Sequence, residues 1–256
     1  MKSLTKHLTA KQKANETILI PYIMAGAQGL NQLAAEIQLL SQAGASAIEL
    51  GIPFSDPVAD GPVIQEAGLR ALKQKVTLGK IIQQLKKIKT STPLVIMTYF
   101  NPIFTYGLDK FVQDLAETNV KGLIIPDLPY EHRKLVTPLL AKSDLALVPL
   151  IALTTPKERI PELTKAGEGF IYAVAVNGVT GIGRDYQESL DEHLAYIQKV
   201  SDKPVLAGFG VSTKEHVERF RKNCAGVIVG SKIVQMLGEG KQEEVRVFIE
   251  EITCDS

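Results

Sequence analysis

Apolar residues along the chain fall into short continuous runs that alternate with longer segments of helical periodicity. Runs that are apolar throughout are typical of parallel strands covered on both faces by helices. They predict strands at Ile18–Met24, Ala45–Gly51, Leu94–Tyr99, Gly122–Pro126, Ala146–Ile151, Phe170–Val174, Val205–Gly208 and Gly226–Val229. The intervening segments predict helices at Asn31–Gln42, Leu78–Lys89, Leu108–Thr118, Glu131–Ala141, Pro156–Ala166, Gln187–Val200, Thr213–Asn223 and Gln242–Ile252.

Eight β/α units within 256 residues predict an α/β fold of one domain, a single (β/α)₈ TIM barrel over residues 1–256. Two helices fall outside the repeat. One is an N-terminal helix at Lys2–Lys13, and the other lies at Pro62–Lys73, after the second strand. An open doubly wound sheet is the competing layout, but it usually has fewer strands and gives no reason for active groups after so many of them.

Composition narrows the function without naming it. The formal net charge of +1 is too small to attract nucleic acid or an anionic membrane surface. No apolar run approaches the roughly 20 residues that span a bilayer, and the first residues lack the apolar core of a signal peptide. Cys224 and Cys254 have no metal-ligand spacing. We therefore expect a cytoplasmic protein with no metal site, no membrane contact and no nucleic-acid partner.

Two acids in the stretch from Ile48 to Gly61 stand out as candidate catalytic groups. Period-2 alternation puts Glu49 among small residues at the carboxyl end of the second strand, where a solvent-facing role is not expected. Two prolines stiffen the loop that returns Asp60 towards the same strand end. Two carboxyls on one rim suit proton transfer, because burial can shift the pKa of one carboxyl while the other stays ionised. The alternative for Asp60 is a helix cap, which is the commoner use of Asp before Gly-Pro.

Glycine-rich loops follow the last three predicted strands. They contain Thr180-Gly181, Gly208-Phe209-Gly210 and Gly230-Ser231. Glycine lets backbone N–H groups approach an anion closely, and barrel enzymes commonly hold a phosphate beyond strands 7 and 8. The sequence therefore predicts a phosphate site there, whereas Lys232 fits better as an exposed lysine in a first helical turn.

The stretch Ile48-Glu-Leu-Gly-Ile-Pro-Phe-Ser-Asp-Pro-Val-Ala-Asp-Gly61 resembles, over its whole length, a signature of the tryptophan synthase alpha subunit family. The family pattern is aliphatic-Glu-aliphatic-Gly, two residues, aromatic-Ser-Asp-Pro, two residues, Asp-Gly. The resemblance continues through Tyr172 to Gly181, Gly208 to Gly210 and Gly230-Ser231, so it covers nearly the whole chain.

This resemblance implies a lyase that splits indole-3-glycerol phosphate into indole and glyceraldehyde 3-phosphate. In the family pattern Glu49 is the acid/base at the indole carbon and the hydroxyl, and Asp60 holds and deprotonates the ring N–H. Tyr22 and Tyr172 would shape the indole pocket, and Gly181, Gly210, Gly230 and Ser231 would bind the phosphate. No cofactor is implied in this subunit. The implied partner is a pyridoxal-phosphate beta subunit in an α₂β₂ assembly, docked over loops 53–62, 101–107 and 176–184.

Two departures from the family pattern lie near the predicted site. Ala175-Val176-Asn177 replaces the usual Ser and polar residue, and Ala25-Gly26-Ala27-Gln28 replaces Ala-Gly-x-Pro. The nearest alternative is a stand-alone lyase with the same reaction and no partner. A sugar-phosphate isomerase or epimerase would share the phosphate loops but would not need the acid pair, and a non-catalytic regulatory subunit would not need intact acids.

Overall fold

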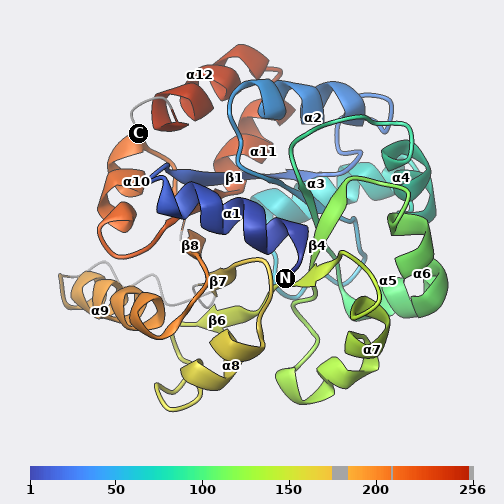
Figure 1. The fold of residues 1–256 in the computed structure, drawn as a ribbon. Helices are drawn as coiled ribbons and strands as arrows, with labels where there is room; N and C mark the ends of the chain where they lie inside the picture. Colours follow the sequence, from blue (N-terminus) through green and yellow to red (C-terminus); the bar gives the residue numbers. More distant parts are fainter. Residues whose placement is uncertain (175–183, 209, 254–256) are drawn as a thin grey trace.

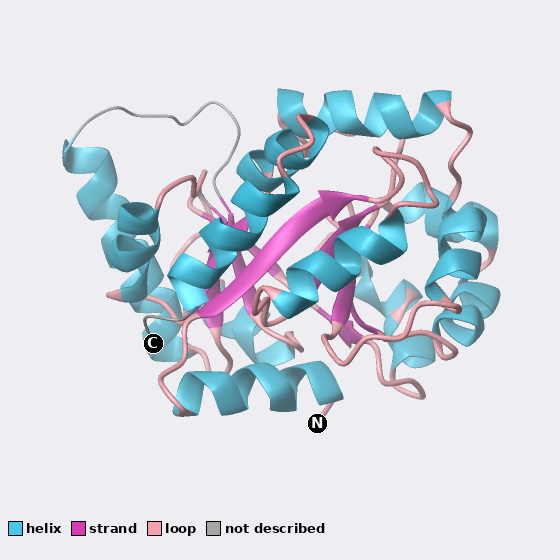
Figure 2. Cartoon of the chain, turned by 90° about the horizontal axis from the view of Figure 1, so that it is seen from above, coloured by secondary structure: helices cyan, strands magenta, loops and turns pink. Residues whose placement is uncertain are grey.

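The computed structural model describes residues 1–174, 184–208 and 210–253. Within these ranges the strands form one parallel sheet surrounded by helices (Figures 1 and 2). Its spatial order is β5-β4-β3-β2-β1-β9-β8-β7-β6. The strands are β1 (Ile18–Met24), β2 (Ile48–Gly51), β3 (Leu94–Met97), β4 (Val120–Ile124), β5 (Ala146–Leu147), β6 (Leu150–Ala152), β7 (Ile171–Val174), β8 (Val205–Gly208) and β9 (Gly226–Val229).

The sheet closes through the fifth predicted strand, which the structure divides into β5 and β6. The N–H of Val148 donates to the carbonyl of Leu123 on one side (2.9 Å), and the N–H of Tyr172 donates to the carbonyl of Pro149 on the other (3.0 Å). Pro149 has no N–H of its own to donate to the ladder, which accounts for the break. The predicted TIM-barrel-like α/β fold is confirmed, with the fifth strand interrupted.

Side chains alternate between the barrel interior and the helical layer. Ile18, Ile20, Ala47, Val95 and Ile124 belong to one buried cluster, and their strand neighbours belong to the larger cluster packed on the helices. Leu4 and Leu8 of the N-terminal helix α1 (Ser3–Lys13) join the interior cluster. The predicted extra helix therefore packs its apolar face against the barrel interior.

Most predicted helices are present. They are α2 (Leu33–Gln42), α3 (Pro62–Lys73), α4 (Leu78–Leu85), α6 (Leu108–Leu115), α9 (Arg184–Val200), α10 (Lys214–Arg221) and α12 (Gln242–Thr253), and α11 (Ser231–Gly238) begins where the Gly230-Ser231 motif indicated a helix start. Helix α3 has the predicted bounds, α9 and α12 are longer than predicted, and α2, α4, α6 and α10 are shorter. The Thr213 side chain caps α10 by accepting from the N–H of His216 (3.3 Å). No described helix is both long and apolar enough to cross a membrane.

Three local predictions were wrong. Residues 101–107 were expected to be a loop, but they lie largely in a helix, α5 (Phe100–Tyr106), whose first N–H donates to Asp127 Oδ1 (2.8 Å). This cap comes from another β/α unit, so no local signal announced the helix. Residues 131–141 form a 3₁₀ helix, η1 (Tyr130–Leu135), followed by the short α7 (Thr137–Leu140). Helix α8 (Ile160–Ala166) begins later than predicted, because Thr155 Oγ1 accepts from the N–H of Ala152 and caps no helix.

Candidate active site

A cavity of about 220 Å³ lies at the carboxyl ends of the strands, where the glycine-rich loops converge. All the candidate site residues that the structure describes line it, and these are Tyr22, Glu49, Asp60, Tyr172, Gly208, Gly210, Gly230 and Ser231. The structure thus brings together side chains from the beginning, middle and end of the chain. Thr180, Gly181 and Phe209 lie outside the described residues, so their placement stays a prediction.

Glu49 is fully buried on β2, beside Tyr22 of β1 and Val95 of β3 in the register of the sheet. Neither carboxyl oxygen has a hydrogen-bond partner in the described structure. Burial raises the pKa of Glu49 from 4.5 to about 8, and the negative charge of Asp60 adds to this shift. A buried carboxyl without partners is costly, so a group in this state is a candidate for chemistry rather than for structure.

Asp60 faces the same cavity from the loop between β2 and α3. The residue at the N-cap position of α3 is Gly61, and no side chain caps this helix, so the cap alternative for Asp60 does not hold. Burial raises the pKa of Asp60 from 3.8 to about 6. At neutral pH the pair therefore consists of a protonated Glu49 and a largely ionised Asp60, a division that suits one acid and one base.

Two tyrosines flank the acids, and each ring occupies space that a glycine leaves open. A Cβ atom on Gly51 would lie 1.8 Å from Tyr22 Oη, and one on Gly208 would lie 2.3 Å from Tyr172 Cε2. Burial raises the pKa of both phenols well above the ordinary value, and the two carboxylates raise it further. The tyrosines are therefore neutral walls of the cavity and do not serve as bases.

The opposite end of the cavity is built from backbone. Gly210 has φ +59°, a left-handed conformation that favours glycine, and a Cβ there would meet no atom within 4 Å. Helix α11 begins at Ser231 after Gly230, so its free first-turn N–H groups and its dipole favour an anion. Lys232 also lines the cavity, although the sequence favoured an exposed position for it.

Sequence reasoning missed several apolar lining residues, among them Met97, Ile64 and Ile228. Met97 is the last residue of β3, and reading strand ends for apolar as well as polar side chains would have found it. Ile64 lies on α3, and its place in the cavity could not be predicted from the sequence. It depends on how that helix packs over the mouth of the barrel.

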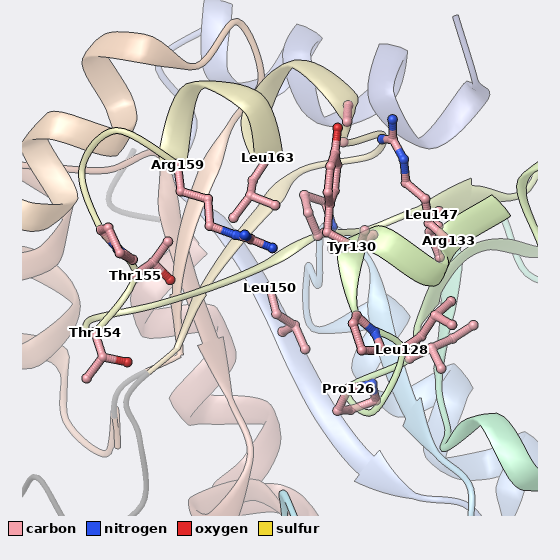
Figure 3. A pocket seen from close by; sticks show the side chains of 17 residues that line it. Pro126, Leu128, Tyr130, Arg133, Leu147, Leu150, Thr154, Thr155, Arg159 and Leu163 are labelled. Atoms are coloured by element: carbon pink, nitrogen blue, oxygen red, sulfur yellow. The ribbon is translucent and has the colours of Figure 1, made fainter.

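A larger cavity of about 370 Å³ lies elsewhere, between η1 and α8 beside the divided fifth strand (Figure 3). Leucines and prolines form much of its lining, Arg133 stacks over the Tyr130 ring, and Arg159 pairs with Glu131. Among the described residues that line it there is no carboxylate. The larger cavity therefore lacks a carboxylate that could transfer protons. The smaller cavity, which contains Glu49, is the candidate active site.

Known proteins of one family match this chain over nearly its whole length. A family model described as tryptophan synthase alpha chain matches residues 8–255. A tryptophan synthase alpha chain from Listeria innocua is 55% identical over 249 residues, covering 97% of this chain and 96% of that protein. One from Streptococcus thermophilus is 57% identical over 250 residues, with coverage of 97% and 96%. The chain belongs to the tryptophan synthase alpha chain family.

Solved structures of the family have the same fold. The tryptophan synthase subunit alpha of Campylobacter jejuni superposes with a TM-score of 0.84 at 36% identity, covering 93% of this chain and 96% of that one. A chain of Mycobacterium tuberculosis tryptophan synthase gives a TM-score of 0.89 at 31% identity, covering 99% and 97%.

Membership of the tryptophan synthase alpha chain family establishes the reaction. It is the cleavage of indole-3-glycerol phosphate, a lyase reaction of tryptophan biosynthesis, and the family implies a beta-subunit partner. The resemblance read from the sequence is confirmed, and the isomerase, epimerase and non-catalytic alternatives are set aside. Among the described residues, no cluster of His, Cys, Asp and Glu could hold a metal ion.

Proposed function

We propose that Glu49 and Asp60 perform the proton transfers of the retro-aldol cleavage. The reaction needs a proton on the indole carbon, removal of the side-chain hydroxyl proton and stabilisation of the positive ring nitrogen. Glu49, protonated at neutral pH, gives its proton to the carbon and then accepts the hydroxyl proton as the carbon–carbon bond breaks and the aldehyde forms. Asp60, largely ionised, accepts a hydrogen bond from the ring N–H and balances the positive charge on the nitrogen. A proton that Asp60 takes from the nitrogen returns to it as the carbon–carbon bond breaks, so that indole leaves with its N–H. The observation that carries this assignment is the complete burial of Glu49 with both carboxyl oxygens unpartnered.

Substrate binding follows from the two ends of the cavity. Tyr22 and Tyr172 provide the aromatic walls for the indole ring, next to the acids. The phosphate binds at the opposite end, on Gly208, Gly210, Gly230 and Ser231, where the α11 dipole contributes about 0.3–1 kcal/mol and the N–H donors and the Ser231 hydroxyl contribute the rest. Thr180, Gly181 and Phe209 complete this site in our proposal.

The beta subunit docks over the carboxyl ends of the strands, in an α₂β₂ assembly that carries pyridoxal phosphate in the beta subunit and no cofactor in this one. Two large apolar side chains support this surface, because Val58 is 80% exposed in the Asp60 loop and Phe104 is 64% exposed on α5. In the docked assembly both side chains would be taken out of water, which favours association. The chain acts as a single barrel domain in the cytoplasm, where indole passes directly to the partner.

Turnover of indole-3-glycerol phosphate by the purified chain, with and without a pyridoxal-phosphate beta subunit, tests the proposal. We expect slow indole release from the chain alone and faster cleavage when the beta subunit is added, because docking favours closure of the loops over the site. Full activity alone, with no response to the beta subunit, would favour a stand-alone lyase. No cleavage in either mixture would refute the proposed roles of the acids.

A further inference from the structure

Asp60 lies on a loop, yet side chains from other parts of the chain hold the backbone on both sides of it. The N–H of Ala59, the preceding residue, donates to Tyr99 Oη at 2.9 Å. On the other side, Gln65 Nε2 donates to the carbonyl oxygen of Asp60 itself at 2.8 Å. These two hydrogen bonds bracket the one residue of the loop whose carboxyl faces the cavity.

Tyr99 is a rigid anchor for this loop. It is 3% exposed and directly precedes α5, and its ring centroid lies 5.1 Å from that of Phe54, at the start of the same loop. The next residue, Phe100, is held by Asp127 through its N–H. Burial is the main cause that raises the pKa of Tyr99 to about 12, so the phenol stays neutral beside Asp60.

We infer that Tyr99 and Gln65 are positioning residues that hold Asp60 over the cavity. This inference rests on the proposed role of Asp60 in the lyase reaction. Neither residue lines the cavity in the described structure, so each acts through the loop rather than on the substrate. Within the loop the N–H of Val58 donates to the carbonyl of Asp56 (3.0 Å) and the N–H of Asp60 donates to that of Pro57 (3.3 Å). Tyr99 and Gln65 add hydrogen bonds from outside the loop. Small misplacements of a catalytic group cost large factors in rate, which is why such anchors matter.

Two substitutions test the inference from opposite sides of Asp60. Tyr99→Phe keeps the ring and its packing on Phe54 but removes the acceptor, and Gln65→Met keeps the length but removes the donor. Tyr106→Phe is the matched control, because it also removes a phenol, one at the end of α5 that donates to Asp114 (2.7 Å) and does not line the cavity. Loss of one hydrogen bond is worth about 0.5–1.5 kcal/mol, so amide exchange of the segment 53–61 should become roughly 2–13-fold faster in both test variants.

In the same variants kcat should fall about tenfold with little change in KM, because the substrate contacts remain. Release of the loop also exposes Asp60, so its pKa should fall from about 6 towards 3.8, and the acid limb of the pH–rate profile should move to lower pH. Tyr106→Phe should change neither exchange in segment 53–61 nor kcat.

Three results would overturn the inference: wild-type exchange in Tyr99→Phe and Gln65→Met, faster exchange with unchanged kcat, or a raised KM with unchanged kcat, which indicates a substrate contact. If Tyr99→Phe does not fold, Gln65→Met decides the question. Wild-type turnover in Asp60→Asn would instead refute the proposed role of Asp60, while the exchange data would still report on the two anchors.

Discussion

Replacement of Glu49 by Gln should abolish most of the activity and at the same time stabilise the fold. Gln keeps the size of the side chain and removes the proton exchange, and general acid–base groups are typically worth about 10²–10⁴ in rate. The stability gain comes from the same burial that prepares the acid. A pKa of about 8 in the fold, against 4.5 for the ordinary side chain, makes ionisation in the cavity cost about 5 kcal/mol more than in the unfolded chain.

The sign of the pH dependence follows from this raised pKa. As pH rises, the unfolded chain loses the Glu49 proton first. The buried Glu49 therefore lowers the free energy of unfolding from about pH 4.5 upward, and this destabilisation is complete above about pH 8. By proton linkage, this destabilisation is about 1 kcal/mol at pH 5, about 3 kcal/mol at pH 7 and about 4 kcal/mol at pH 8. Gln does not titrate, so the stability of Glu49→Gln relative to wild type should rise by about 3.5 kcal/mol between pH 5 and pH 8.

Urea denaturation at the two pH values measures this difference directly. Comparison across pH cancels the cost of the unpartnered Gln amide, which is the same at both values. Glu66→Gln is the control, because the Glu66 side chain is 76% exposed and its replacement removes no buried carboxyl. A pH-independent stability difference for Glu49→Gln would refute the raised pKa, and near-normal turnover would refute the mechanism.

Other substitutions test the remaining parts of the site. Asp60→Asn should lower kcat by about 10²–10⁴ and lower the pKa of Glu49, because the charge that helps to raise it is removed; a pH–rate profile checks both. Gly210→Val should raise KM for indole-3-glycerol phosphate by at least about tenfold, since the side chain would occupy open cavity space at a left-handed φ, and unchanged KM would argue against a phosphate site there. Gly51→Ala should displace the Tyr22 ring and reduce both stability and turnover, whereas Gly61→Ala, which meets no atom within 4 Å, should fold normally; thermal unfolding of the pair distinguishes them.

Much of the barrel could be predicted from the sequence because its signals are local. Continuous apolar runs such as Ile18–Met24 have one stable solution, a strand covered on both faces, and the structure buries every residue of that run. Glu49 could be singled out because a carboxylate at the end of an apolar strand is expected to be buried, and buried carboxylates without a partner are rare. The family motif then predicted its partner Asp60, eleven positions further on in the loop to α3, and both residues line one cavity.

Tertiary structure alone decided what no neighbour along the chain could indicate. Helix α5 exists where a loop was expected because Asp127, from the following β/α unit, accepts its first N–H. The pKa of Glu49 depends on complete burial without a partner, and the position of Asp60 depends on Tyr99, which lies 39 residues away from Asp60 in the sequence. These effects arise from desolvation and from hydrogen bonds between distant segments, so they come into being only when the barrel closes.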